Sequence, residues 1–189
     1  MMLLILGLVI FLGVHSIAIV APSFRDAARS RMGDGAWKAL YGLASLVGFI
    51  LLCYGFGLAR QAPVVLYVPP HWLRSLALLV MLPVFPLVFA VYLPGRIKTA
   101  AQHPMLAAVK FWGFAHLLAN GNLGDVLLFG GLLAWAVVDR ISLKSRPTPP
   151  RNAVGRSSND VVAVVLGLAT YALFVFWAHR LLFGVSPLA

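Results

Sequence analysis

The chain has 189 residues, of which 61% are hydrophobic and only 11% are charged, and its mean hydropathy is +0.94. Soluble domains carry about 25% charged residues, so these values exclude an ordinary water-soluble fold and indicate an integral membrane protein. A net charge of +10 would suit nucleic-acid binding in a soluble chain, but here the basic residues lie between apolar runs, and no nucleic-acid partner is expected. At about 20 residues per crossing, the length predicts an all-α fold, a polytopic transmembrane bundle of about six helices in a single domain over residues 1–189.

The first two predicted spans cover residues 2–21 and 37–58. The first run lacks the basic start and the small-residue cleavage site of a signal peptide, so it is expected to stay in the mature protein. A basic loop with Arg25, Arg29 and Arg31 is expected between the two spans. The second span contains glycines that permit close approach of another helix. They are Gly42, Gly48, Gly55 and Gly57.

Prolines shape the next part of the chain. Residues 60–72 are rich in proline and are expected to form an irregular or interfacial loop. The third span, residues 73–92, contains Pro83 and Pro86, which predict a kink whose freed carbonyls must be satisfied by neighbouring helices.

The fourth and fifth spans, residues 104–120 and 123–138, are expected to form an antiparallel hairpin. Pro104 suits the first turn of a helix, because its missing N–H is not needed there. The residues Asn120-Gly121-Asn122 are typical of a tight turn between the two helices.

The last part of the chain is predicted to contain a long loop and a sixth span. Residues 142–159 are polar and rich in proline, and residues 161–182 are apolar. Ser158, Asn159 or Asp160 is expected to be the N-cap of this last helix.

Basic residues set the predicted orientation. The first, third and fifth loops hold most of the lysine and arginine residues, whereas the opposite side holds only Arg60, Arg74 and Arg180. The positive-inside rule then places the loop 142–159 in the cytoplasm and both termini outside.

Two of the five histidines, His15 and His116, fall well inside predicted spans, and His179 lies near the end of the sixth. Ionisable residues in hydrocarbon are costly and mark functional sites by default. A neutral imidazole can ligate iron, copper or zinc. The alternative is that each histidine bonds to a neighbouring helix and packs. No haem-attachment motif surrounds the single cysteine, Cys53, so any haem would be held non-covalently.

The fourth span carries further polar candidates. Lys110 lies seven residues after His103, on about the same helical face and roughly 10 Å into the bilayer. Two interpretations stay open: the side chain snorkels to the interface, or its ammonium neutralises a propionate or another anionic group of a ligand. Trp112 lies one turn from His116 and provides an aromatic wall beside it, or simply packs.

A set of short motifs extends over nearly the whole chain. They are Gly13-Val14-His15-Ser16, Gly35-Ala36-Trp37, His103-Pro104-Met105-Leu106, Trp112, Ala115-His116-Leu117-Leu118-Ala119-Asn120-Gly121, Leu128-Phe129-Gly130-Gly131 and Trp135. Through these motifs the sequence resembles the NnrU family.

The resemblance implies a bacterial inner-membrane protein linked with nitrite and nitric oxide reduction, and a kinship with 15-cis-zeta-carotene isomerases, which bind haem b. By matching motifs, the haem ligands fall on His15 and His116, and His103 occupies the His-Pro position. Lys110 and Trp112 complete the candidate cofactor-binding residues. One departure is Gln102, where the family commonly has arginine.

Two functions follow as expectations. The first is a haem b membrane protein that supports nitric oxide reduction or catalyses a redox-dependent isomerisation of an apolar substrate. The alternative is a non-catalytic assembly or accessory factor for a respiratory membrane complex, which docks through glycine faces of the second and fifth helices. A transporter is less favoured, because the chain has no internal repeat and few polar residues to line a pathway.

Overall fold

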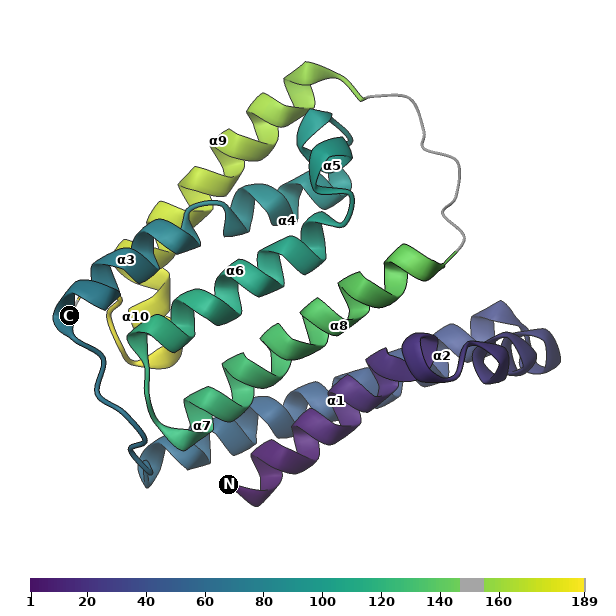
Figure 1. The fold of residues 1–189 in the computed structure, drawn as a ribbon, viewed down its shortest axis with the longest axis horizontal. Coiled ribbons are helices and arrows are strands. Elements are labelled where there is room, and N and C mark those ends of the chain that lie inside the picture. Colours follow the sequence, from purple (N-terminus) through teal and green to yellow (C-terminus); the bar gives the residue numbers. More distant parts are fainter. Residues whose placement is uncertain (147–154, 189) are drawn as a thin grey trace.

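The computed structural model describes residues 1–146 and 155–188, and every regular element in them is a helix. Five helical segments of this part of the chain are long and apolar enough to cross a membrane, and the shorter Pro104–Ala119 is also apolar. The protein is therefore an all-α membrane protein, as its composition predicts. Figure 1 shows the helices running between two ends of the bundle, with both termini at the same end.

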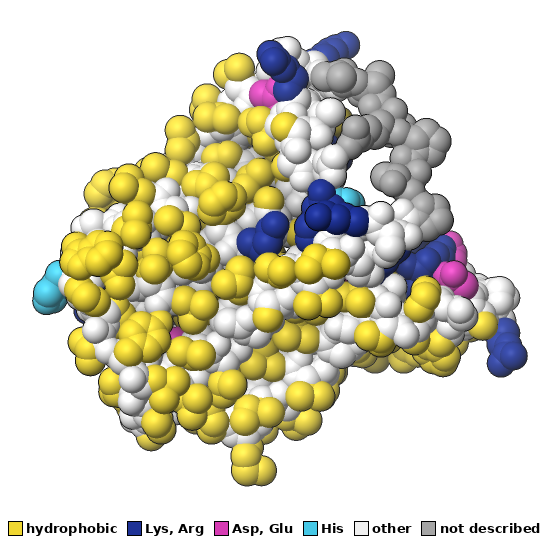
Figure 2. All heavy atoms as spheres, viewed as in Figure 1, with side chains coloured by type: hydrophobic (Ala, Val, Ile, Leu, Met, Phe, Trp, Pro, Cys, Tyr) yellow, Lys and Arg dark blue, Asp and Glu magenta, His cyan; other side chains and the backbone are white. Residues whose placement is uncertain are grey.

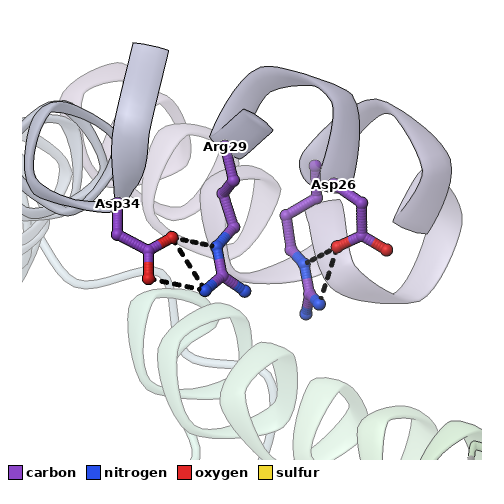
Figure 3. A network of polar contacts seen from close by, with 4 residues as sticks. Asp26, Arg29 and Asp34 are labelled. Carbon is purple, nitrogen blue, oxygen red and sulfur yellow. Dashed lines mark hydrogen bonds and ion pairs between the residues drawn. The ribbon is translucent and has the colours of Figure 1, made fainter. Parts of the chain in front are cut away.

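The first helix, α1 (Met2–Val20), is followed after one residue by α2 (Pro22–Gln61). The predicted basic loop before residue 37 is therefore wrong, because this segment is helical up to a break at Gly33, where φ is +82°. Pro22 suits the start of a helix, and two ion pairs, Arg25 with Asp26 and Arg29 with Asp34, neutralise charges at the break (Figure 3). The charged residues thus form a short polar helix rather than a loop.

Glycines bring α1 and α2 into backbone contact. A Cβ atom at Gly7 or Gly55 would overlap the backbone of the opposite helix, and one at Gly48 would lie 2.7 Å from the backbone nitrogen of Phe11. In a membrane, such close approach replaces the hydrophobic effect as the source of helix association. Gly57 lies on the same helix as Gly55 but has no atom within 4 Å of its Cβ position.

The third span is broken where proline predicts it. Helix α3 (His71–Met81) ends before Pro83, and α4 (Val84–Tyr92) follows it. At the break, the N–H of Leu82 bonds to the carbonyl of Leu79, so the carbonyl of Leu78 loses its usual partner four residues on. The hydroxyl of Tyr171, on another helix, donates to this Leu78 carbonyl at 2.9 Å. The predicted kink, with a freed carbonyl satisfied by a neighbour, is confirmed.

A short helix, α5 (Arg96–Ala101), precedes α6 (Pro104–Ala119), which begins at Pro104 as predicted. The start of α5 is capped from a distant part of the chain, because the Asp160 carboxylate accepts bonds from the N–H groups of Arg96 and Ile97 at 2.9 and 3.0 Å. The predicted N-cap role of Asp160 in its own helix is therefore wrong.

The predicted hairpin between the fourth and fifth spans is confirmed. After the turn at residues 120–122 come α7 (Leu123–Asp125), the π-helical turn η1 (Val126–Gly130) and α8 (Gly131–Ser145). Asn122 and Asp125 form a capping box at the start of this run. The helix continues past the predicted end at residue 138, because Arg146 pairs with Asp139 and bonds to Ser142.

The last span is formed by α9 (Ser157–Leu173), the π-helical turn η2 (Phe174–Ala178) and α10 (His179–Phe183). Arg156 is the N-cap residue, and no side chain caps the helix, so Ser158 and Asn159 do not have the predicted role either. Asn159 donates instead to the carbonyl of Pro94 at 2.7 Å. Residues 147–154 of the predicted loop lie outside the described residues.

The spans pack in a row. Contacts link α2 to α1, α1 to α8, α8 to α6, α6 to α3 and α4, and α4 to α9. Figure 2 shows that the face in view is mostly apolar, and exposed side chains such as Leu43, Phe176 and Trp177 belong to the membrane-crossing helices. Such a surface is unsuited to water and suited to lipid.

We expect Gly55→Ala to destabilise the protein by about 1–3 kcal/mol, because the new methyl group would push α1 away from α2. Gly57→Ala is the matched control. Its methyl group meets open space, and alanine favours helix over glycine by up to about 1 kcal/mol, so stability should be unchanged or higher. Thermal unfolding in mild detergent measures both variants. Equal effects of the two substitutions would contradict the close packing of α1 on α2.

Candidate functional site

His15 lies on α1 among aromatic rings from three helices. Its ring centroid is 4.3 Å from that of Phe11, 5.4 Å from Tyr41 on α2 and 5.7 Å from Trp135 on α8. The Nδ1 atom lies 2.7 Å from the carbonyl oxygen of Phe11, one turn earlier. Because a carbonyl only accepts, Nδ1 carries the proton and Nε2 keeps its lone pair.

Two buried polar atoms accompany His15. Within the described residues, the indole Nε1 of Trp135 and the hydroxyl of Ser45 have no hydrogen-bond partner. Ser45 lies one helical turn after Tyr41, on the face of α2 that meets α1. A buried unsatisfied donor costs about 1–3 kcal/mol. This region therefore offers a free imidazole nitrogen and an unused indole N–H, with an unused hydroxyl on the same face of α2 as Tyr41.

His116 lies near the C-terminal end of α6. Its ring stacks on Phe129 of η1 with centroids 4.4 Å apart, and lies 4.8 Å from Trp112. Its Nδ1 donates to the carbonyl of Trp112 at 2.8 Å, so this imidazole also keeps a free Nε2. Two helices thus hold their histidines in the same tautomer by the same local bond.

The loop between α2 and α3 holds the C-terminal end of α6, which carries His116, through hydrogen bonds. The hydroxyl of Tyr67 donates to the carbonyls of Leu117 and Asn120, and the amide of Asn120 donates to the carbonyl of His116. The carbonyl of Gly121 accepts from the N–H groups of Leu66 and Tyr67. These bonds satisfy the end of α6 and fix the position of the imidazole.

The NnrU protein family model matches residues 3–187. The chain belongs to this family. Comparison with curated proteins and with solved structures finds no further match. The arrangement around His15 and His116 is thus that of an NnrU-family protein.

The structure brings together some of the predicted site residues of this NnrU-family chain. Trp112 and His116 are in ring contact, as expected from their spacing. His15 has no ring contact or hydrogen bond with either of them among the described residues. It contacts Trp135, six residues after the Phe129 that stacks on His116. Six helical residues correspond to about 9 Å along the axis and about 120° around it.

The His-Pro position of this NnrU-family chain lies in a polar corner formed by α5, α6 and α8. His103 is the N-cap residue of α6. Before it, Gln102 has a φ of +60°, a conformation that few residues other than glycine adopt. The Gln102 side chain accepts a bond of 2.7 Å from Arg140. An arginine at this place, as is common in the family, would meet the Arg140 cation instead.

Lys110 faces away from both histidine sites. It lines an open groove with Ala107, Phe111, Phe114 and Leu133. No contact joins it to His103 among the described residues. Its predicted grouping with His103 and the histidine ligands is therefore not formed by direct contact.

Sequence reasoning missed several residues of these sites. Tyr41 and Trp135 meet His15 only through the packing of α1, α2 and α8. Phe129 meets His116 across the hairpin. The four-residue spacing of Tyr41 and Ser45 places both on one face of a helix, but it does not indicate that this face meets His15.

Burial lowers the pKa of His103 below its ordinary value of 6.5, the charge of Arg140 lowers it further, and Asp139 opposes the shift. The folded state therefore binds a proton at His103 less tightly than the unfolded state does. The stability that this contributes is present above about pH 6.5 and is lost as the pH falls through and below that value.

We therefore expect His103→Gln to lose less thermal stability than the unmodified protein when the pH falls from about 7.5 to 5.5. The control is His71→Gln, since His71 is an exposed histidine at the start of α3. Unfolding temperatures across this pH range provide the measurement. The same acid sensitivity in His103→Gln and in the unmodified protein would contradict the assignment.

Proposed function

We propose that the protein binds haem b non-covalently through the imidazoles of His15 and His116, singly or together. The observation that carries the proposal is that both imidazoles bond through Nδ1 to their own helix and keep Nε2 free inside an apolar bundle. This second bond on Nδ1 is typical of histidines that ligate metals, because it fixes the tautomer and orients the ring. No other group among the described residues uses either Nε2 atom.

Cofactor binding explains the surroundings of His15 better than a purely structural packing role does. A packed histidine needs no unsatisfied donors beside it, yet the Trp135 indole and the Ser45 hydroxyl are both buried and unused. Polar groups of a cofactor would take these hydrogen bonds. The aromatic rings of Phe11, Tyr41 and Trp135 would exclude water around it.

The two histidines meet different residues of the η1–α8 helix. His15 contacts Trp135 and His116 contacts Phe129, and these two residues lie about 120° apart around the helix. The donor set therefore suits a haem held by one imidazole at a time, and joint ligation requires these helices to shift. Bound haem would supply a redox-active iron that can take a small ligand such as nitric oxide.

The role that follows is support of nitrite and nitric oxide reduction, or redox-dependent isomerisation of an apolar substrate. The apolar walls beside both imidazoles support a small, uncharged partner. The protein's own residues would hold the cofactor, keep water out and fix the imidazole tautomers. These contributions are common to both reactions.

The test is the visible absorption spectrum of the protein purified in mild detergent, oxidised and reduced. We expect a Soret band that is shifted or lowered several-fold by His15→Ala and by His116→Ala. His71→Ala is the control, because it is the same substitution at an exposed histidine, and it should leave the band unchanged. A change with only one of the two variants would identify a single ligand. Haem content and spectrum unaffected by both substitutions would refute the proposal.

A second candidate is an accessory factor of a respiratory membrane complex. Gly42 and Gly57 support it, because both are exposed on α2 and no atom lies within 4 Å of their Cβ positions. Such faces let another helix approach closely. In the same preparation, a colourless protein from haem-replete cells that co-purifies with a larger complex would favour this function.

We also propose a location in the bacterial inner membrane, with the loop 142–159 in the cytoplasm and the termini outside. Figure 1 supports this, because the break in α2, helix α5 and the end of α8 lie at one end of the bundle and both termini lie at the other. In a variant that lacks Cys53 and carries Lys144→Cys, the new cysteine should react with a membrane-impermeant thiol reagent only from the cytoplasmic side. Reaction from the outside would show that the orientation is the opposite one.

A further inference from the structure

An open groove lies between α6 and α8, with a lysine among apolar side chains. Its volume is about 330 Å³. Four residues at the spacing of one helical face line it from α6, and Leu133 closes it from α8. They are Ala107, Lys110, Phe111 and Phe114. Figure 2 shows basic side chains set into the otherwise apolar face over this part of the bundle.

The structure gives the ammonium of Lys110 no anionic partner among residues 1–146 and 155–188. Among the described residues, no hydrogen bond or ion pair includes it. The chain has only five acidic residues, and each of them already has another partner. The pairs are Asp26 with Arg25, Asp34 with Arg29, Asp125 with Asn122, Asp139 with Arg146, and Asp160 with the start of α5. No acidic side chain of the protein is therefore left to act as the counter-charge of Lys110.

The length of α6 brings that counter-charge within reach. The helix has 16 residues, which at 1.5 Å per residue cover about 24 Å, less than the roughly 30 Å of hydrocarbon in a bilayer. Lipids beside a short helix adapt by local thinning, which draws their headgroups inward. Lys110 lies six residues after Pro104, about 9 Å into the helix. A lysine side chain extends several ångströms further toward the surface.

We propose that this groove binds an anionic phospholipid of the surrounding membrane, with its phosphate on the Lys110 ammonium. One acyl chain lies along Phe111 and Phe114, which are 42% and 47% exposed. The lipid neutralises a cation that the protein leaves unpaired, and it fills the apolar groove that runs from that cation. This site is separate from the two histidines and does not depend on haem binding.

The test is native mass spectrometry of the full-length protein in mild detergent, with phosphatidylglycerol or phosphatidylcholine added. We expect the unmodified protein to retain phosphatidylglycerol preferentially, and Lys110→Met to reduce that retention by roughly fivefold, the size expected for one lysine at an anionic membrane surface. Lys38→Met is the matched control, because it removes an equal charge from an exposed position on α2. It should retain the lipid as the unmodified protein does.

Lys110→Arg keeps the charge and should keep the preference, which separates the loss of a cation from a loss of folding. The proposal is overturned if Lys110→Met and Lys38→Met behave alike, or if both lipids bind the unmodified protein equally, as a merely snorkelling lysine would allow. Displacement by a free fatty acid that itself binds more tightly than phosphatidylglycerol would overturn the assignment to a phospholipid. The haem spectrum of each variant tests the proposed function separately and has no bearing on the lipid-binding proposal.

Discussion

The structure depends on the need to satisfy backbone polar groups inside a membrane, where water cannot do so. At three interruptions or helix ends, a side chain from elsewhere in the chain donates to the exposed carbonyl. Tyr171 donates to Leu78 at the proline break, Lys98 donates to Val91 at the end of α4, and Tyr67 donates to Leu117 and Asn120 at the end of α6. Each interruption therefore also becomes a tertiary contact that holds two elements together.

The same constraint explains how the His15 site is positioned. Because apolar surfaces gain little by meeting each other in lipid, α1 and α2 associate through close backbone packing at Gly7, Gly48 and Gly55. This packing sets α1 in register with α2, so that Phe11 and His15 lie opposite Phe49 and Tyr41. The geometry of the candidate site is thus a consequence of the glycines that pack α1 against α2.

Much of the fold follows from the sequence, because apolar runs and prolines act locally. The crossing helices, the break near Pro83, the start of α6 at Pro104 and the turn at Gly121 all come from residues that dictate their own conformation. The errors involve charged residues. The arginines before Gly33 pair with aspartates and form a helix, and Asp160 caps α5 instead of its own helix. A carboxylate can cap any nearby helix start, and only the tertiary fold decides which one.

The sequence likewise predicts part of the candidate site and misses the rest. The sequence identifies His15, Trp112 and His116, because polar and aromatic residues within an apolar span stand out. It does not show that η1–α8 separates the two histidines, because this depends on the π-helical turn that contains Phe129.

A π-helical turn accommodates an additional residue within a helix, and one residue corresponds to about 100° of rotation. The turn at residues 126–130 therefore sets the direction in which Trp135 projects relative to Phe129. Since Trp135 meets His15 and Phe129 meets His116, this local irregularity fixes the angle between the two imidazoles.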